Sequence, residues 1–253
     1  MQSIAISLLL LLCIFGSACL GMLLRTRLPT AHFTDDSKDV LKLAMGLVAT
    51  MAALVLGLLT ASAKTSFDVE TSEVQQGAAK IIQLDRLLAR YGPEAKPVRD
   101  ELKALIALRL QLTWPEEYPA SGSAKPSESP VVQERFLDHL DALEPKNDTQ
   151  RDLQSAAVQL WHDLLATRWL VYSQAARPLP TPFLIVMGLW LSVLFAAFGL
   201  IAARNATTVA GLLVCAVVVS TSVFLILEMN RPLDGLIKIS SLPLRYALSQ
   251  LGR

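Results

Sequence analysis

Residues Val40–Ser66 read VLKLAMGLVATMAALVLGLLTASAKTS, and no charged residue occurs between Leu43 and Ala63. As an α-helix, a run of that length reaches roughly 30 Å, which is the thickness of the hydrocarbon core of a bilayer. The stretch therefore predicts a transmembrane helix, around which the rest of the chain is organised.

This predicted helix has distinct faces, because successive residues turn by about 100°. One face carries small residues: Gly46, Ala49, Ala53, Gly57 and Thr60. An adjacent face carries Leu43, Leu47, Thr50, Leu54 and Leu58, and a third carries Val48, Val55 and Leu59. Small residues at four-residue spacing let helix backbones approach closely in lipid, so the first face is a candidate helix-packing face. The alternative is that glycine and alanine are simply common in membrane helices.

Three further apolar runs are also long enough to cross a membrane, namely Ile4–Leu24, Phe183–Ala203 and Ala206–Leu227. The run Ile4–Leu24 lacks the basic start of a cleaved signal peptide, so we interpret it as a retained transmembrane helix. The predicted fold is all-α: a polytopic membrane protein with four transmembrane helices and a helical soluble domain between the second and third. The expected divisions are residues 1–63, 64–181, 182–227 and an amphipathic C-terminal tail, 228–253.

The soluble stretch has the periodicity of amphipathic helices. Its first apolar seam consists of Val74, Ala78, Ile81, Leu84 and Leu88. Such three- and four-residue spacing predicts helices, and four are expected here. In one interpretation the organising helix runs unbroken from Val40 to Arg90, where Gly92-Pro93 stops it. In the tail, residues 244–251 predict an amphipathic helix that lies on the membrane or on a neighbouring element.

The composition excludes several classes of protein. The chain of 253 residues is 53% hydrophobic. Its net charge of +1 is too small to produce an electrostatic potential that attracts nucleic acid. Cys13, Cys19 and Cys215 all lie in apolar runs, which is not the pattern of a disulfide framework or a zinc site. No nucleophile–base arrangement, phosphate loop or metal-ligand spacing is present, so we expect no catalytic residue, no metal and no cofactor.

Three stretches resemble a family of bacterial membrane proteins known as the bestrophin-like domain family: Asp39–Phe67, Ile82–Pro97 and Phe198–Ser240. A more distant likeness is to bestrophins, which are pentameric anion channels with a carboxylate-x-Pro-Phe-Gly motif after their fourth helix. The corresponding residues here are Glu228, Asn230, Arg231, Pro232, Asp234 and Gly235. Leucine replaces the phenylalanine, Asp234 intervenes before the glycine, and the acidic cluster of calcium control is missing.

The resemblance implies an oligomeric channel, a pentamer if the likeness to bestrophins holds, that conducts small anions through a pore lined by the second transmembrane helix. Its candidate pore-lining residues are Leu47, Thr50, Leu54 and Leu58. Apolar rings of this kind gate by dewetting. In the competing interpretation this stripe faces lipid or the fourth helix. The alternative function is a non-conducting adaptor or sensor whose helical domain binds a partner protein.

Four crossings place both termini and residues 64–181 on one side of the membrane. Basic residues near the two surfaces are almost balanced, although those flanking the first helix favour an outside N-terminus. The resemblance implies a bacterial inner membrane with the helical domain in the cytoplasm, and we follow the resemblance.

Overall fold

The computed structural model describes residues 2–27, 35–118, 130–175, 181–233 and 235–253, and these residues form helices and no strands. The α-helices are α1 (Gln2–Arg27), α2 (Asp35–Tyr91), α3 (Lys96–Thr113), α4 (Pro130–Asp141), α5 (Asp148–Ala175), α6 (Thr181–Ile201), α7 (Ala206–Met229) and α8 (Leu242–Gln250), with a short 3₁₀ helix, η2, at Pro93–Ala95. The predicted all-α fold is confirmed. Within the described residues, four helices are long and apolar enough to cross a membrane: Ser3–Arg27, Lys38–Tyr91, Phe183–Ile201 and Ala206–Met229.

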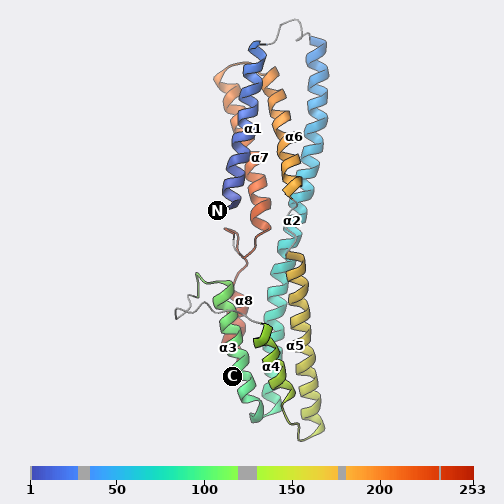
Figure 1. The fold of residues 1–253 in the computed structure, drawn as a ribbon, viewed down its shortest axis with the longest axis vertical. Coiled ribbons are helices and arrows are strands. Elements are labelled where there is room, and N and C mark those ends of the chain that lie inside the picture. The colour runs from blue at the N-terminus through green and yellow to red at the C-terminus, as the bar shows by residue number, and fades with distance from the viewer. Residues whose placement is uncertain (1, 28–34, 119–129, 176–180, 234) are drawn as a thin grey trace. The chain divides into compact units, whose positions relative to one another are not determined.

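The chain divides into two compact units (Figure 1). The membrane unit consists of Met1–Phe67 and Arg177–Ile237, and the polar unit consists of Asp68–Ala176 and Lys238–Arg253. Helix α2 belongs to both, because its 57 residues run without interruption through the division at Phe67.

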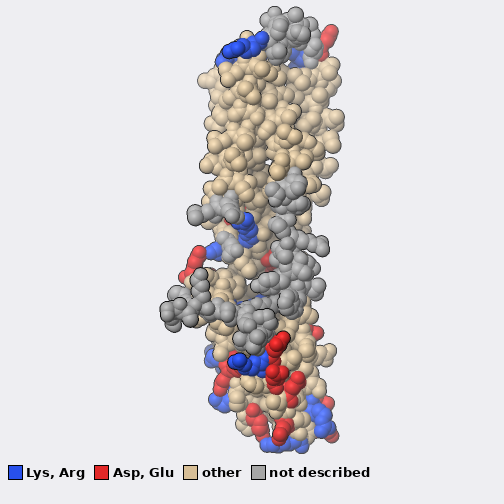
Figure 2. All heavy atoms as spheres, in the orientation of Figure 1, with Lys and Arg blue, Asp and Glu red and all other residues tan. Residues whose placement is uncertain are grey.

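In the membrane unit, α1 packs against α6 and α7. The first part of α2 joins this bundle through Ala52, which is buried with Ile14 of α1, Phe195 of α6 and Ala216 of α7. Figure 2 shows that the visible surface over these helices carries no Lys, Arg, Asp or Glu between its two ends. Such a surface suits acyl chains and would be costly in water.

Polar contacts close the α6–α7 hairpin. Arg25 donates hydrogen bonds to the carbonyls of Ile201 and Ala202 at the end of α6. The Asn205 side chain accepts a bond of 2.7 Å from the Thr208 N–H and so caps α7. A cation at a helix C-terminus and an asparagine at an N-terminus both satisfy backbone groups that the helix leaves unpaired.

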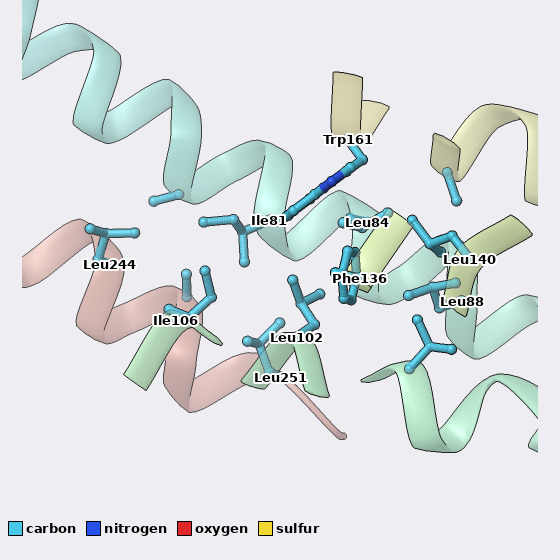
Figure 3. Packing of buried hydrophobic residues seen from close by; sticks show 14 of the residues in the cluster. Ile81, Leu84, Leu88, Leu102, Ile106, Phe136, Leu140, Trp161, Leu244 and Leu251 are labelled. Atoms are coloured by element: carbon cyan, nitrogen blue, oxygen red, sulfur yellow. The ribbon is translucent and has the colours of Figure 1, made fainter. Parts of the chain in front are cut away.

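The polar unit has a closed core of large apolar side chains (Figure 3). Ile81, Leu84 and Leu88 of α2 are at most 1% exposed. They pack with residues of α3, α4, α5 and α8 and with the residue that follows α8, namely Leu102, Ile106, Leu110, Phe136, Leu140, Trp161, Leu244 and Leu251. The apolar seam that predicts the second half of α2 therefore faces this core.

Helix α8 covers α3. The sequence left open whether the amphipathic tail helix lies on the membrane or on a neighbouring element. In the structure it packs on a neighbouring element, because Leu244 and Ala247 are buried in the core of the polar unit. The Trp114 Nε1 donates a bond of 2.9 Å to the Ile239 carbonyl, and Lys238 pairs with Glu116 at 2.7 Å.

A buried ion pair ties α2 to α3. The Arg99 guanidinium makes two bonds, of 2.8 and 2.9 Å, to the carboxylate of Asp85, whose side chain is 1% exposed. These hydrogen bonds raise the pKa of Arg99 above its ordinary value. Arg99 also donates to the Arg253 carbonyl at 3.1 Å, so the pair holds the residues that follow α8. Because each charge satisfies the other, both tolerate removal from water.

Candidate functional site

Among the residues that the structure describes, the buried positions in the membrane part of α2 lie along one face. Ala52 is 6% exposed, and Val55, Leu56 and Leu59 pack beside it against α1, α6 and α7. Val55 and Leu59 belong to the third face of the sequence-derived helix. Within the described residues, the leucine stripe and most of the small-residue face lie outside this packing face, although Ala49 and Thr60 are partly buried.

The candidate pore-lining residues lie on the open side of α2. Leu47, Leu54 and Leu58 are 66%, 75% and 71% exposed, and Thr50 is also exposed. The Thr50 hydroxyl donates a bond of 2.8 Å to the Gly46 carbonyl of its own helix. The stripe therefore presents a surface that is almost entirely apolar.

The candidate helix-packing residues lie on the same open side. Gly46, Ala53 and Gly57 are exposed, and Ala49 is partly buried. Apart from the adjacent residues and the backbone of its own helical turns, a Cβ built at Gly46 or Gly57 would meet no described atom within 4 Å. Nothing in the described chain requires glycine at these two positions, so any close helix contact there involves another molecule.

A close backbone contact does occur elsewhere, where sequence reasoning did not place it. A Cβ added at Gly21 of α1 would overlap the carbonyl oxygen of Ala196, and one added at Gly199 of α6 would overlap that of Ala18. Each helix therefore has an Ala-x-x-Gly step at the crossing. Paired small residues of this kind were the available signal, and they are the usual way in which membrane helices approach each other.

The residues after α7 form a compact turn. Glu228 is 2% exposed, and its carboxylate accepts a hydrogen bond from the Leu236 N–H. The Gly235 N–H donates to the Arg231 carbonyl at 2.9 Å, and the Arg231 N–H donates to the Glu228 carbonyl at 3.0 Å. This arrangement brings together Glu228, Arg231 and Gly235 of the predicted post-helix motif.

The other members of that motif have structural positions as well. Asn230 ends α7, with its side-chain amide donating to the Ile226 carbonyl at 2.8 Å, and Pro232 is buried. Asp234 lies outside the described residues. At Gly235 a Cβ would lie 2.6 Å from a Glu228 carboxylate oxygen and 2.9 Å from the Arg231 carbonyl, so a side chain there would disturb the turn.

The described residues show no group of three or more His, Cys, Asp or Glu side chains that could hold a metal ion. The structure instead offers a lipid-compatible bundle with one open helix face and a hydrogen-bonded turn at the end of its last crossing. These features define a polytopic helical membrane protein.

Comparison with known families identifies it further. The model of the bestrophin-like domain matches residues 12–244, which is nearly the whole chain, and the protein therefore belongs to the bestrophin-like domain family. Searches of curated proteins and of solved structures found no match.

Proposed function

We propose that the protein assembles into a bestrophin-like oligomeric channel for small anions, with α2 lining the pore. Membership of the bestrophin-like family supports the class of function. The observation that carries the proposal is the open side of α2, where Leu54 is 75% exposed and a Cβ at Gly57 would meet no atom of another described helix. The preference for anions rests on the likeness to bestrophins alone.

The glycines of the membrane unit support assembly through α2. Gly21 and Gly199 lie where two backbones touch, whereas Gly46 and Gly57 face open space. Glycine inside a helix costs about 0.5–1 kcal/mol relative to alanine, so two glycines on one open face favour a close contact with another copy. In that assembly the neighbouring leucine stripe faces the symmetry axis.

The leucine stripe supports a hydrophobic constriction. A ring made of Leu47, Leu54 and Leu58 from several copies would be narrow and apolar, and such a ring gates by dewetting. Thr50 would add a hydroxyl oxygen whose proton already bonds to its own helix.

Oligomeric mass in detergent tests the assembly. The wild-type chain is expected to form a closed ring of copies, and Gly46→Leu with Gly57→Leu is expected to dissociate it, because two bulky side chains block the close contact. Gly16→Leu is the matched control, because Gly16 of α1 also has no neighbour within 4 Å. A monomeric wild-type chain, or equal dissociation in the control, would refute the proposal.

Chloride efflux from vesicles tests conduction. Leu54→Ala is expected to increase efflux because it widens the constriction, while Leu189→Ala is expected to leave it unchanged. Leu189 of α6 is 61% exposed but belongs to a different helix. Vesicles that stay silent to several anions, combined with a monomeric mass, would favour the adaptor, whose protein partner should then be lost on deletion of residues 64–177.

We place the polar unit in the cytoplasm of a bacterial cell, as the likeness to bestrophins implies. In a cysteine-free background, Asp152→Cys should be protected from a membrane-impermeant thiol reagent in intact spheroplasts, and Arg27→Cys should react. The reverse pattern would place the polar unit outside.

A further inference from the structure

The turn after α7 carries large apolar side chains that the described residues leave exposed. Within the membrane unit, Leu236 is 73% exposed, Leu233 is 40% exposed and Ile237 is 37% exposed. Single exposed leucines are ordinary, but three such side chains within five residues of one turn are not explained by chance exposure alone.

Helix geometry sets the depth of this turn. From Ala206 to Glu228, α7 rises by about 33 Å at 1.5 Å per residue, which slightly exceeds the roughly 30 Å of the hydrocarbon core. With the polar Arg204-Asn205 hairpin at the opposite surface, Glu228 reaches the boundary between acyl chains and headgroups. Because the Leu236 N–H binds the Glu228 carboxylate, Leu236 lies at the same depth.

Two backbone N–H groups of the turn have hydrogen-bond acceptors within the protein, which suits a poorly hydrated site. The Gly235 N–H donates to the Arg231 carbonyl, and the Leu236 N–H donates to the Glu228 carboxylate. Irregular backbone is tolerated near the hydrocarbon only where its polar groups are paired internally. Glu228 is only 2% exposed, so the turn also covers a polar carboxyl group that would otherwise lie against lipid.

We infer that this turn is an interfacial anchor, in which Leu233, Leu236 and Ile237 insert into the bilayer surface while the Glu228 carboxylate holds the backbone in place. The occupant of the apolar surface is the lipid bilayer that α7 crosses, because the turn directly follows that helix, whose own exposed apolar side chains include Val218 and Leu225. Apolar side chains at this level bury about 5–10 Å into the boundary between headgroups and acyl chains.

The test uses the full chain, with Cys13, Cys19 and Cys215 replaced by alanine and Leu236→Cys labelled with an environment-sensitive fluorophore. The protein is reconstituted in phosphatidylcholine–phosphatidylglycerol vesicles, with Asp152→Cys as the water-exposed control. Lipids that carry a quencher at a shallow acyl position are expected to quench the label at position 236 at least about twofold more than the control. Iodide in the aqueous phase is expected to quench it less.

Two results would overturn the inference. Iodide quenching equal to that of the Asp152→Cys control would place the turn in water. Protection from both lipid-borne and aqueous quenchers would show that another copy or another protein covers the turn.

A pair of variants tests the role of the carboxylate. Glu228→Gln keeps a carbonyl oxygen as acceptor for the Leu236 N–H and should preserve lipid quenching, whereas Glu228→Ala removes the acceptor and should shift quenching toward iodide. Equal behaviour of the two variants would show that the Glu228 side chain does not hold the turn. None of these outcomes depends on conduction, so the inference can fail while the channel proposal stands.

Discussion

The membrane unit and the polar unit differ in which residues lie at their helix–helix contacts. In the polar unit, large side chains such as Leu84 and Phe136 are completely buried, and polar side chains cover the outside. In the membrane unit the closest contacts occur at glycines, Gly21 and Gly199, while leucines such as Leu12 and Leu54 are more than 60% exposed.

The difference follows from the solvent. In water, burial of apolar area drives packing, so the largest apolar side chains go inside. In lipid an exposed leucine costs nothing, and close backbone approach together with van der Waals contact holds helices together. Helix α2 belongs to both units. The residues that it packs against other helices are Ala52 and Val55 in the membrane unit and Ile81, Leu84 and Leu88 in the polar unit.

The largest expected effect is the loss of the buried charge pair in the polar unit. Arg99→Ala leaves the Asp85 carboxylate, whose side chain is 1% exposed, without its cation and should destabilise the unit by about 3–5 kcal/mol. Chemical unfolding followed by circular dichroism measures this loss. Asp100→Ala is the control, because the Lys96–Asp100 pair is 75% and 61% exposed and should contribute no more than about 1 kcal/mol. Similar values for the two variants would contradict the assigned role of Arg99.

The glycine crossing gives the next largest effect. Gly21→Val places carbon atoms where the Ala196 carbonyl lies, so α1 and α6 must separate, at a cost of about 1–3 kcal/mol. Gly16→Val on the same helix meets open space and should cost much less. Thermal unfolding midpoints in one detergent compare the two, and an unchanged midpoint for Gly21→Val would show that this contact is not tight.

A smaller effect is expected where the segment before α8 joins α3. Trp114→Phe keeps the ring in the core but removes the donor to the Ile239 carbonyl, which should cost about 1 kcal/mol. Residues 238–253 should then be cleaved faster in limited proteolysis. Trp190→Phe, on the partly exposed surface of α6, should leave the cleavage rate unchanged, and equal acceleration in both variants would refute the prediction.

The smallest effect concerns an exposed pair of the polar unit. Lys146 bonds to Glu94 at 2.6 Å, and this hydrogen bond lowers the pKa of Glu94 below its ordinary value of 4.5 and raises that of Lys146 above 10.5. The pair therefore stabilises the folded state fully between pH 4.5 and pH 10.5. This stabilisation is lost as the pH falls through the lowered pKa of Glu94 or rises through the raised pKa of Lys146.

Unfolding midpoints measured against pH check this behaviour. The small advantage of the wild type over Glu94→Gln should be constant near neutral pH and disappear in acid. An advantage that grows as the pH falls would contradict the assigned direction.

Much of the fold followed from local patterns. Gly92-Pro93 predicts the end of α2, and Gly92 indeed has a φ of 131°, a left-handed value that other residues rarely adopt. Asn147, a residue type favoured just before a helix, accepts a hydrogen bond of 2.8 Å from the Gln150 N–H at the start of α5. These signals are local, so they act before any tertiary contact forms.

The candidate site was less accessible to sequence reasoning. The residues on the faces of α2 could be sorted by periodicity, but a leucine that packs in a bundle and one that faces lipid are equally apolar. The α1–α6 crossing was missed because the small residues of α2 formed the longer stripe. The pore-lining and packing roles assigned to α2 remain predictions.

By itself, the sequence determined that this protein is helical, has four segments long and apolar enough to cross a membrane, and carries a polar helical unit between the second and third, because hydrophobic length and period are properties of consecutive residues. Only the tertiary structure decided which face of α2 the bundle covers, that α8 packs on α3, and that the Glu228 carboxylate binds the Leu236 N–H. Those outcomes depend on groups that are distant in sequence or chemically alike, and three-dimensional packing alone distinguishes them.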